Sequence, residues 1–182
     1  MNQEEDTMNA LYTLVWLFAL WKWGDWKNWN KYYPTFLFLL LGDFLYQYLL
    51  SDFYPMWKYN PQGIDDNIGL THTHIAFTIM FVKYPATILI YLSKFPENNK
   101  IKQIFYVGAW VLLYILNELN DLKFNLIKYD HGWSIWWSLL FNCVMFSILR
   151  IHYVKPLLAW LLSIIFILFL WKVFEVPPTV FR

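Results

Sequence analysis

Long apolar runs and short polar connectors alternate along the chain. Each run is apolar on all helical faces, and the runs cover residues 8–23, 34–50, 70–92, 101–119, 133–151 and 156–174. A helix that crosses a bilayer needs about 20 mostly apolar residues, and it satisfies its own backbone in lipid without closing a barrel. The pattern therefore predicts an all-α integral membrane protein, a single domain over residues 1–182 built as a bundle of about six transmembrane helices.

Composition strengthens this interpretation. The 182 residues are 59% hydrophobic, 23% aromatic and 15% charged, whereas soluble chains are about 45–50% apolar and about 25% charged. A soluble domain of this composition would have to cover its surface with large apolar side chains, which promotes aggregation. The expected partner is therefore the lipid bilayer, and a homo-oligomer or a membrane-protein partner stays open. A net charge of +1 leaves no basic stripe for nucleic acid.

Charge asymmetry between the connectors predicts the orientation of the bundle. Eight Lys and Arg residues lie in the first, third and fifth connectors, and five lie on the other side. The eight are Lys22, Lys27, Lys31, Lys94, Lys100, Lys102, Arg150 and Lys155. Because cytoplasmic connectors carry the basic excess, both termini are expected outside. Tryptophans gather near both boundaries, which is typical of an aromatic belt; a cage for a cationic ligand is the alternative.

One carboxylate and one ammonium group interrupt the apolar runs. Asp43 stands within "FLFLLLGDFLYQYLL", about nine residues and roughly 14 Å from the inner boundary. A lone charge at that depth costs at least about 2.5–3.5 kcal/mol. Lys83 lies at matching depth in the third run, where Pro85 removes a backbone hydrogen bond and predicts a kink. We therefore expect a buried ion pair of Asp43 with Lys83. It either belongs to a working site or only fastens two helices, unless Lys83 snorkels to the cytoplasm.

A second polar set lies nearer the outer boundary. Glu118 shares a helical face with Tyr114, and Ser138 and Asn142 recur four residues apart on the next run. His72 and His74 are two residues apart, so only one of them can face the interior. The predicted pocket is lined by His74, Tyr114, Glu118, Ser138 and Asn142.

The sequence gives less support to a metal-binding site or to covalent catalysis. His72, His74, Glu118 and His131 are ligand types that suit zinc, but their spacing matches no established metal motif. Histidines at a membrane boundary are more often solvated. The sequence contains no phosphate-binding loop or nucleophile motif, so no catalytic residue is assigned and the cofactor is unknown.

Four segments carry a resemblance to a known family: "NKYYPTFLFLLLGDFLY", "MWKY", "HGW" and "LRIHYVKPLLAW". The chain resembles a family of small multi-pass membrane proteins from endospore-forming Firmicutes of the Bacillus and Clostridium type. The resemblance covers most of the chain and is most distinctive from Lys31 to Asp43. It implies a bacterial plasma membrane, and it supplies no activity.

The expected function is binding or moving a small solute, ion or lipid. One alternative is a structural or assembly protein whose polar groups only fasten helices. Another is a membrane-embedded, lipid-modifying enzyme that uses Glu118 and a histidine as acid and base. The question of catalysis stays open, and the non-enzymatic interpretations are favoured.

Overall fold

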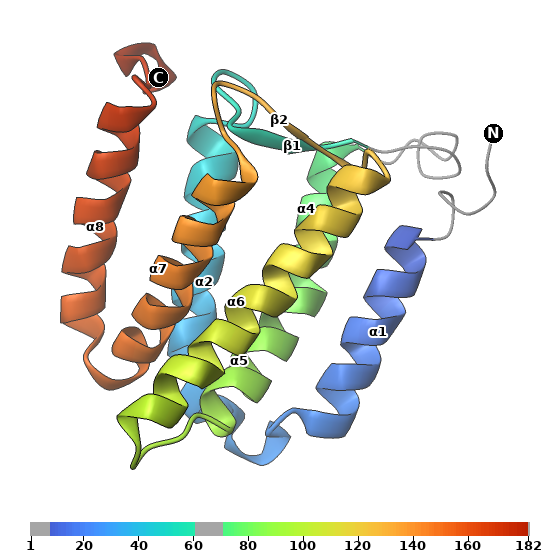
Figure 1. Ribbon diagram of the computed structural model, residues 1–182, viewed down its shortest axis with the longest axis vertical. Helices are drawn as coiled ribbons and strands as arrows, with labels where there is room; N and C mark the ends of the chain where they lie inside the picture. The colour runs from blue at the N-terminus through green and yellow to red at the C-terminus, as the bar shows by residue number, and fades with distance from the viewer. Residues whose placement is uncertain (1–7, 61–70, 182) are drawn as a thin grey trace.

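The computed structural model describes residues 8–60 and 71–181. This part of the chain forms six helical rods, and rods that follow one another along the chain run in opposite directions (Figure 1). Five rods are single helices: α1 (Met8–Trp23), α2 (Trp29–Leu49), α6 (Lys100–Lys123), α7 (Ile135–Val154) and α8 (Pro156–Val173). The third rod, between α2 and α6, consists of α4 (His72–Thr78), a π-helical turn (Ile79–Lys83) and α5 (Tyr84–Ser93). Short 3₁₀ turns lie at Trp26–Asn28 and Pro178–Val180. The predicted all-α class is confirmed.

Three of the rods are long and apolar enough to cross a membrane: His72–Ser93, Ile135–Val154 and Pro156–Val173, with mean hydropathies of 1.7, 1.4 and 2.2. For these three of the six predicted spans, the helical length and apolar composition that a membrane span needs are therefore confirmed. Helix α1 has only 16 residues, so it is shorter than the usual span. A six-span bundle stays a prediction.

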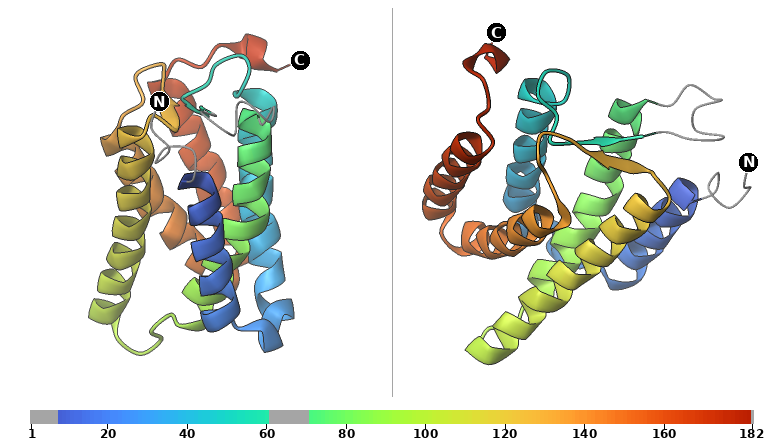
Figure 2. Two further views of the ribbon diagram at one scale, coloured as in Figure 1. Left: turned by 90° about the vertical axis from the view of Figure 1, so that its right-hand side faces the viewer. Right: turned by 45° about the horizontal axis from the view of Figure 1, so that its top comes forward.

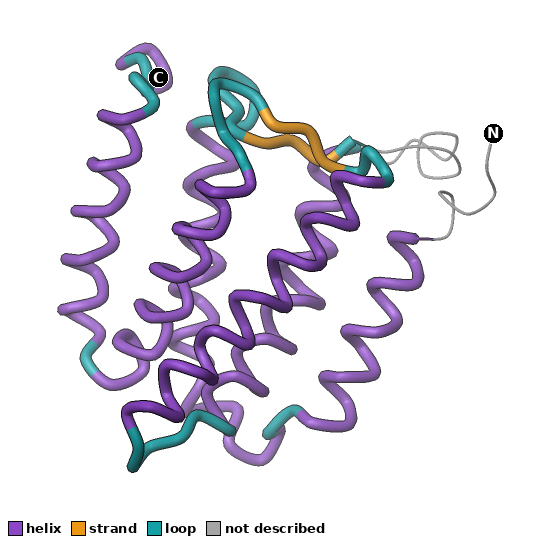
Figure 3. The backbone as a smooth tube through the Cα atoms, in the orientation of Figure 1, coloured by secondary structure: helices purple, strands orange, loops and turns teal. Residues whose placement is uncertain are grey.

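Two connectors that read as loops in the sequence contain strands. Strand β1 (Trp57–Tyr59) pairs with β2 (Ile127–Tyr129) in antiparallel fashion, with Trp57 opposite Tyr129. The strand pair crosses one end of the helices, which we call the strand end (Figures 2 and 3). The opposite end carries connectors 24–28 and 94–99 and Lys155, and we call it the connector end.

Tyr46 of α2 fastens β1 to the helices. Its hydroxyl donates to the Trp57 carbonyl at 2.7 Å and accepts from the backbone N–H groups of Met56 and Trp57 at 3.1 and 3.0 Å. Its ring stacks on the Trp57 ring, with centroids 4.0 Å apart and planes inclined by 7°. One side chain thus satisfies three backbone groups of Met56 and Trp57, at the start of a strand that has a neighbour on one side only.

Where the sequence predicts a kink, the structure has a π-helical turn just before Pro85. Pro85 has no N–H, so the carbonyl four residues earlier, at Phe81, loses its usual partner. The Tyr84 N–H bonds to the Ile79 carbonyl, five residues back. This widened turn absorbs one extra residue, and it ends directly at Lys83 and Tyr84. Lys83 lines the polar cavity, and Tyr84 bonds to Asp43.

The second predicted run begins at residue 34, but helix α2 begins five residues earlier, at Trp29, so that Pro34 lies inside the helix. The first turns of α2 are held from outside, since the Tyr32 hydroxyl donates to Asp25 at 2.8 Å and Trp29 packs on Phe36. Tertiary contacts therefore outweigh the local preference of proline for the helix start.

The main core lies where α5, α6 and α7 meet. Tyr91 and Phe146 are fully buried, and their ring centroids are 5.2 Å apart. The Tyr91 hydroxyl donates to the Phe146 carbonyl at 2.8 Å, so the polar tip of this large aromatic side chain is satisfied inside the core. This packing fixes α6 and α7 relative to the third rod, and these three rods carry most of the site.

Candidate functional site

A cavity of about 110 Å³ lies beneath the strand pair. Its walls come from β1, β2, the third rod, α6, α7 and the loop that precedes α7. Three charged side chains line it: Lys83, Glu118 and Asp121. Its polar lining also includes Tyr59, Tyr84, Tyr114, Ser138 and Asn142. The structure thus brings together four of the five predicted pocket residues, and His74 is not one of the lining residues.

A second, larger groove of about 490 Å³ lies toward the connector end and is lined by Leu20, Trp26, Trp29, Phe81 and Pro85. Its polar side-chain groups are the indole N–H groups of Trp26 and Trp29, and that of Trp26 already donates to the Leu20 carbonyl at 3.1 Å. This groove offers apolar surface without charged groups. The polar cavity is therefore the better candidate for a site with specific chemistry.

Glu118 is held in place by two hydroxyl groups. Ser138 and Tyr129 both donate to its Oε1 atom, at 2.5 and 2.7 Å, and the Trp133 indole N–H donates to the Ser138 hydroxyl at 2.8 Å. Burial raises the pKa of Tyr129 above its usual value, so its hydroxyl stays protonated and remains a donor. These contacts fix Oε1 and leave Oε2 without a hydrogen bond among the described residues.

The ammonium group of Lys83 lies over two aromatic rings, 4.3 Å from the Tyr114 centroid and 5.6 Å from the Trp16 centroid. Ring faces attract cations, and more strongly when water is excluded. The carboxylates of Asp121 and Glu118 act on the same ammonium group electrostatically. Lys83 therefore belongs to the cavity and does not snorkel to the connector end.

Asp43 has different partners from those expected. Tyr84 donates to its Oδ2 atom at 2.7 Å, and Gln47 donates to Oδ1 at 3.4 Å. Across residues 8–60 and 71–181, no ion pair joins Asp43 to Lys83. The reason is geometric: adjacent residues of a helix point about 100° apart. Tyr84 faces α2 and Asp43, whereas Lys83 faces α1 and α6.

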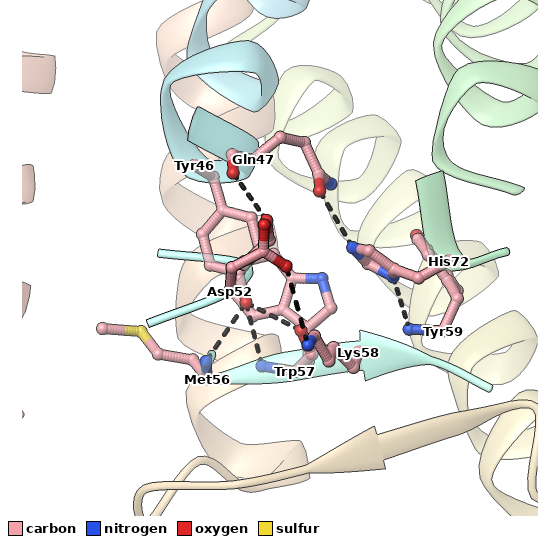
Figure 4. A network of polar contacts seen from close by, with 9 residues as sticks. Tyr46, Gln47, Asp52, Met56, Trp57, Lys58, Tyr59 and His72 are labelled. Carbon is pink, nitrogen blue, oxygen red and sulfur yellow. Dashed lines mark hydrogen bonds and ion pairs between the residues drawn. The ribbon is translucent and has the colours of Figure 1, made fainter. Parts of the chain in front are cut away.

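A chain of hydrogen bonds connects Asp43 to the strand pair through Gln47 and His72. Figure 4 shows the part of this chain from Gln47 through His72 to Tyr59. The Tyr59 N–H donates to His72 Nδ1 at 3.0 Å, and His72 Nε2 lies 2.9 Å from Gln47 Oε1. A backbone N–H only donates, so Nδ1 is the acceptor and Nε2 carries the proton. His72 then donates to Gln47, which donates to Asp43. The chain fixes β1 to α2 and α4.

The predicted metal ligands do not assemble. His72 bonds to Gln47 and Tyr59, and His74 Nδ1 accepts from the Thr71 N–H at 3.1 Å. His131 Nδ1 lies 2.7 Å from the Pro55 carbonyl oxygen. In the described part of the chain, no three His, Cys, Asp or Glu residues are grouped closely enough to hold a metal ion.

Sequence reasoning missed Gln47, Tyr59, Tyr84 and Tyr129. Gln47 could have been predicted as a partner of Asp43, because it follows Asp43 by four residues on the same helical face. Tyr59 and Tyr129 lie on strands that the apolar pattern did not predict. Comparison with known proteins adds nothing to these contacts, since no protein family, curated protein or solved structure matches the chain.

Proposed function

We propose that the chain is a six-span protein of a bacterial plasma membrane and that its cavity binds a small polar solute or ion from the outer side. The observation that carries this proposal is the convergence of Lys83, Glu118 and Asp121 on one cavity. Within the described residues, no ion pair joins them to one another. Charges brought out of water without mutual pairing are costly, which favours a role in binding.

The membrane part of the proposal rests on the alternating rods and on the basic residues. All eight Lys and Arg residues of the first, third and fifth connectors belong to the connector end, against five for the other side, of which Arg182 lies outside the described residues. Cytoplasmic connectors carry the basic excess. The strand end, and with it the cavity, then faces outward.

The size of the cavity limits the solute. A single water molecule needs roughly 10–15 Å³ of such space, whereas pockets for larger organic ligands span roughly 300–1,000 Å³. The cavity of about 110 Å³ therefore suits a solute of a few non-hydrogen atoms. A lipid acyl chain does not fit this space.

The contacts argue against the enzyme alternative, and they restrict the alternative of a helix-fastening role to Asp43. An acid–base pair would need Glu118 beside a histidine, but all four histidines bond elsewhere: His152, the fourth, lies 3.0 Å from the Thr35 hydroxyl. Fastening accounts well for Asp43, whose bonds tie helices to β1. It does not account for Lys83 and Asp121.

Thermal unfolding of the full chain in detergent, with a panel of neutral polyols, small cations, small anions and zwitterions, tests the proposal. We expect at least one class to raise Tm saturably, and we expect Lys83→Met and Glu118→Gln to abolish that rise. Lys128→Met, at an exposed position of β2, should leave it unchanged. If no class raises Tm, the binding function is wrong.

A further inference from the structure

Lys83 presents its hydrogen-bond donors to the cavity without an acceptor. An ammonium group carries three N–H donors, and aromatic rings cover part of this one. None of the described hydrogen bonds or ion pairs uses Lys83. A partly buried donor without an acceptor is unfavourable. This side of the cavity therefore fits an anionic oxygen.

Helix α6 brings the opposite charge to the cavity. Asp121 belongs to α6, one helical turn beyond Glu118, and both carboxylates line the cavity. The side-chain oxygens of Asp121 accept no hydrogen bond in the described ranges. Glu118 uses only Oε1 for Ser138 and Tyr129. Free carboxylate oxygens at this wall fit a cationic group with N–H donors.

A single ion would satisfy one wall and leave the other unpaired. A small zwitterion satisfies both, because its anionic and cationic groups are held apart by one or two atoms. We infer that the solute is a small zwitterion whose anionic group binds Lys83 and whose cationic group binds Asp121 and Glu118. This inference rests on the proposed function and names its ligand class.

Three probes separate the ligand classes on the unmodified full chain in detergent: glycine as the zwitterion, acetate as the anion alone and methylammonium as the cation alone. Each charge-assisted hydrogen bond contributes about 1.5–3 kcal/mol, which is about ten- to a hundredfold in affinity. Isothermal titration should therefore show glycine binding at least about tenfold more tightly than either single-charge probe.

Two variants make the test independent of overall folding. Lys83→Met should weaken glycine about ten- to a hundredfold and make methylammonium the preferred probe. Asp121→Asn should shift the preference toward acetate. A protein that is merely damaged loses all three probes together and cannot exchange one preference for the other. Lys128→Met and Asp52→Asn, at exposed positions outside the cavity, are the matched controls.

The outcomes distinguish this inference from the proposed function. If acetate or methylammonium binds the unmodified chain as tightly as glycine, or a neutral polyol binds and glycine does not, the zwitterion inference is wrong and the binding function stands. If none of the solutes in the panel binds, both are wrong. The probe comparison needs no variant, so it decides even where a substitution prevents folding.

Discussion

The Tyr84 hydroxyl donates a 2.7 Å hydrogen bond to the Asp43 carboxylate, across the contact between α5 and α2. This bond, with the longer one from Gln47, explains how an acidic residue is accommodated within an apolar run. Hydrogen bonds to charged groups contribute about 1.5–3 kcal/mol each. In the proposed membrane span, the two bonds would offset much of the cost of at least about 2.5–3.5 kcal/mol that a lone charge bears there, without an ion pair.

Tyr84→Phe should lower the free energy of unfolding by about 1.5–3 kcal/mol, because it removes a charge-assisted donor and leaves Asp43 undersatisfied. Adding Asp43→Asn should then cost less than it does in the parent protein. Equilibrium unfolding in detergent measures the cycle, with Tyr48→Phe as a control, since Tyr48 is 73% exposed. Equal costs of Asp43→Asn in both backgrounds would mean that the two side chains are not coupled.

A parallel cycle with Lys83→Met separates this explanation from the ion pair that the sequence suggested. We expect the coupling between Asp43→Asn and Lys83→Met to be smaller than that between Asp43→Asn and Tyr84→Phe. The reason is that Lys83 directs its charge toward Tyr114, Asp121 and Glu118. A larger coupling for Lys83 would restore the ion pair as the main interaction of Asp43.

The helices were predictable because lipid-compatible runs of residues are a direct signal. The predicted 8–23 and 156–174 agree with α1 and α8 within one residue. The partners of Asp43 were not predictable in the same way. Matching depth suggested Lys83, but the direction of a side chain depends on helix rotation, and the π-helical turn before Tyr84 changes that rotation locally.

The candidate site was predictable where its residues share one helical face. Ser138 and Asn142 lie four residues apart and both line the cavity. The choice between His72 and His74 was not predictable, since either can face inward. The structure turns His72 toward Gln47 because the Tyr59 N–H of β1 needs an acceptor, and a strand of three residues leaves almost no sequence signal.

Tyr46→Phe should detach the strand pair from α2. It removes one donor bond to Trp57 and the acceptor for two backbone N–H groups, so a loss of about 1–3 kcal/mol in the free energy of unfolding is expected. Hydrogen exchange of the Trp57 amide should accelerate selectively. Tyr48→Phe, two residues away and exposed, should change neither quantity. Unchanged Trp57 exchange in Tyr46→Phe would show that the stacked ring alone holds β1.

Asp25 should make the stability of the protein fall as the pH is lowered through the acidic range. The hydrogen bond from Tyr32, the largest cause, lowers the pKa of Asp25 below its usual 3.8. The stabilisation is therefore complete above pH of about 4 and is lost as the pH falls through the lowered pKa. The Tm difference between the parent protein and Asp25→Asn should shrink over that acidic range. Tyr32→Phe should reduce the difference at neutral pH, and a difference that is constant with pH would contradict this role.

Asn60 and Asn98 should lie on opposite sides of the membrane. Asn60 follows β1 at the strand end, and Asn98 lies in the connector between α5 and α6. Single cysteines at these positions, in a Cys143→Ser background that removes the exposed native thiol, report their side through an impermeant thiol reagent. In intact cells we expect Asn60→Cys to be labelled and Asn98→Cys to be labelled only after the membrane is permeabilised, because the basic connector end should be cytoplasmic. Labelling of Asn98→Cys alone in intact cells would invert the orientation and place the cavity on the cytoplasmic side. Labelling of both would mean that the third rod does not cross the membrane, which would refute the six-span arrangement.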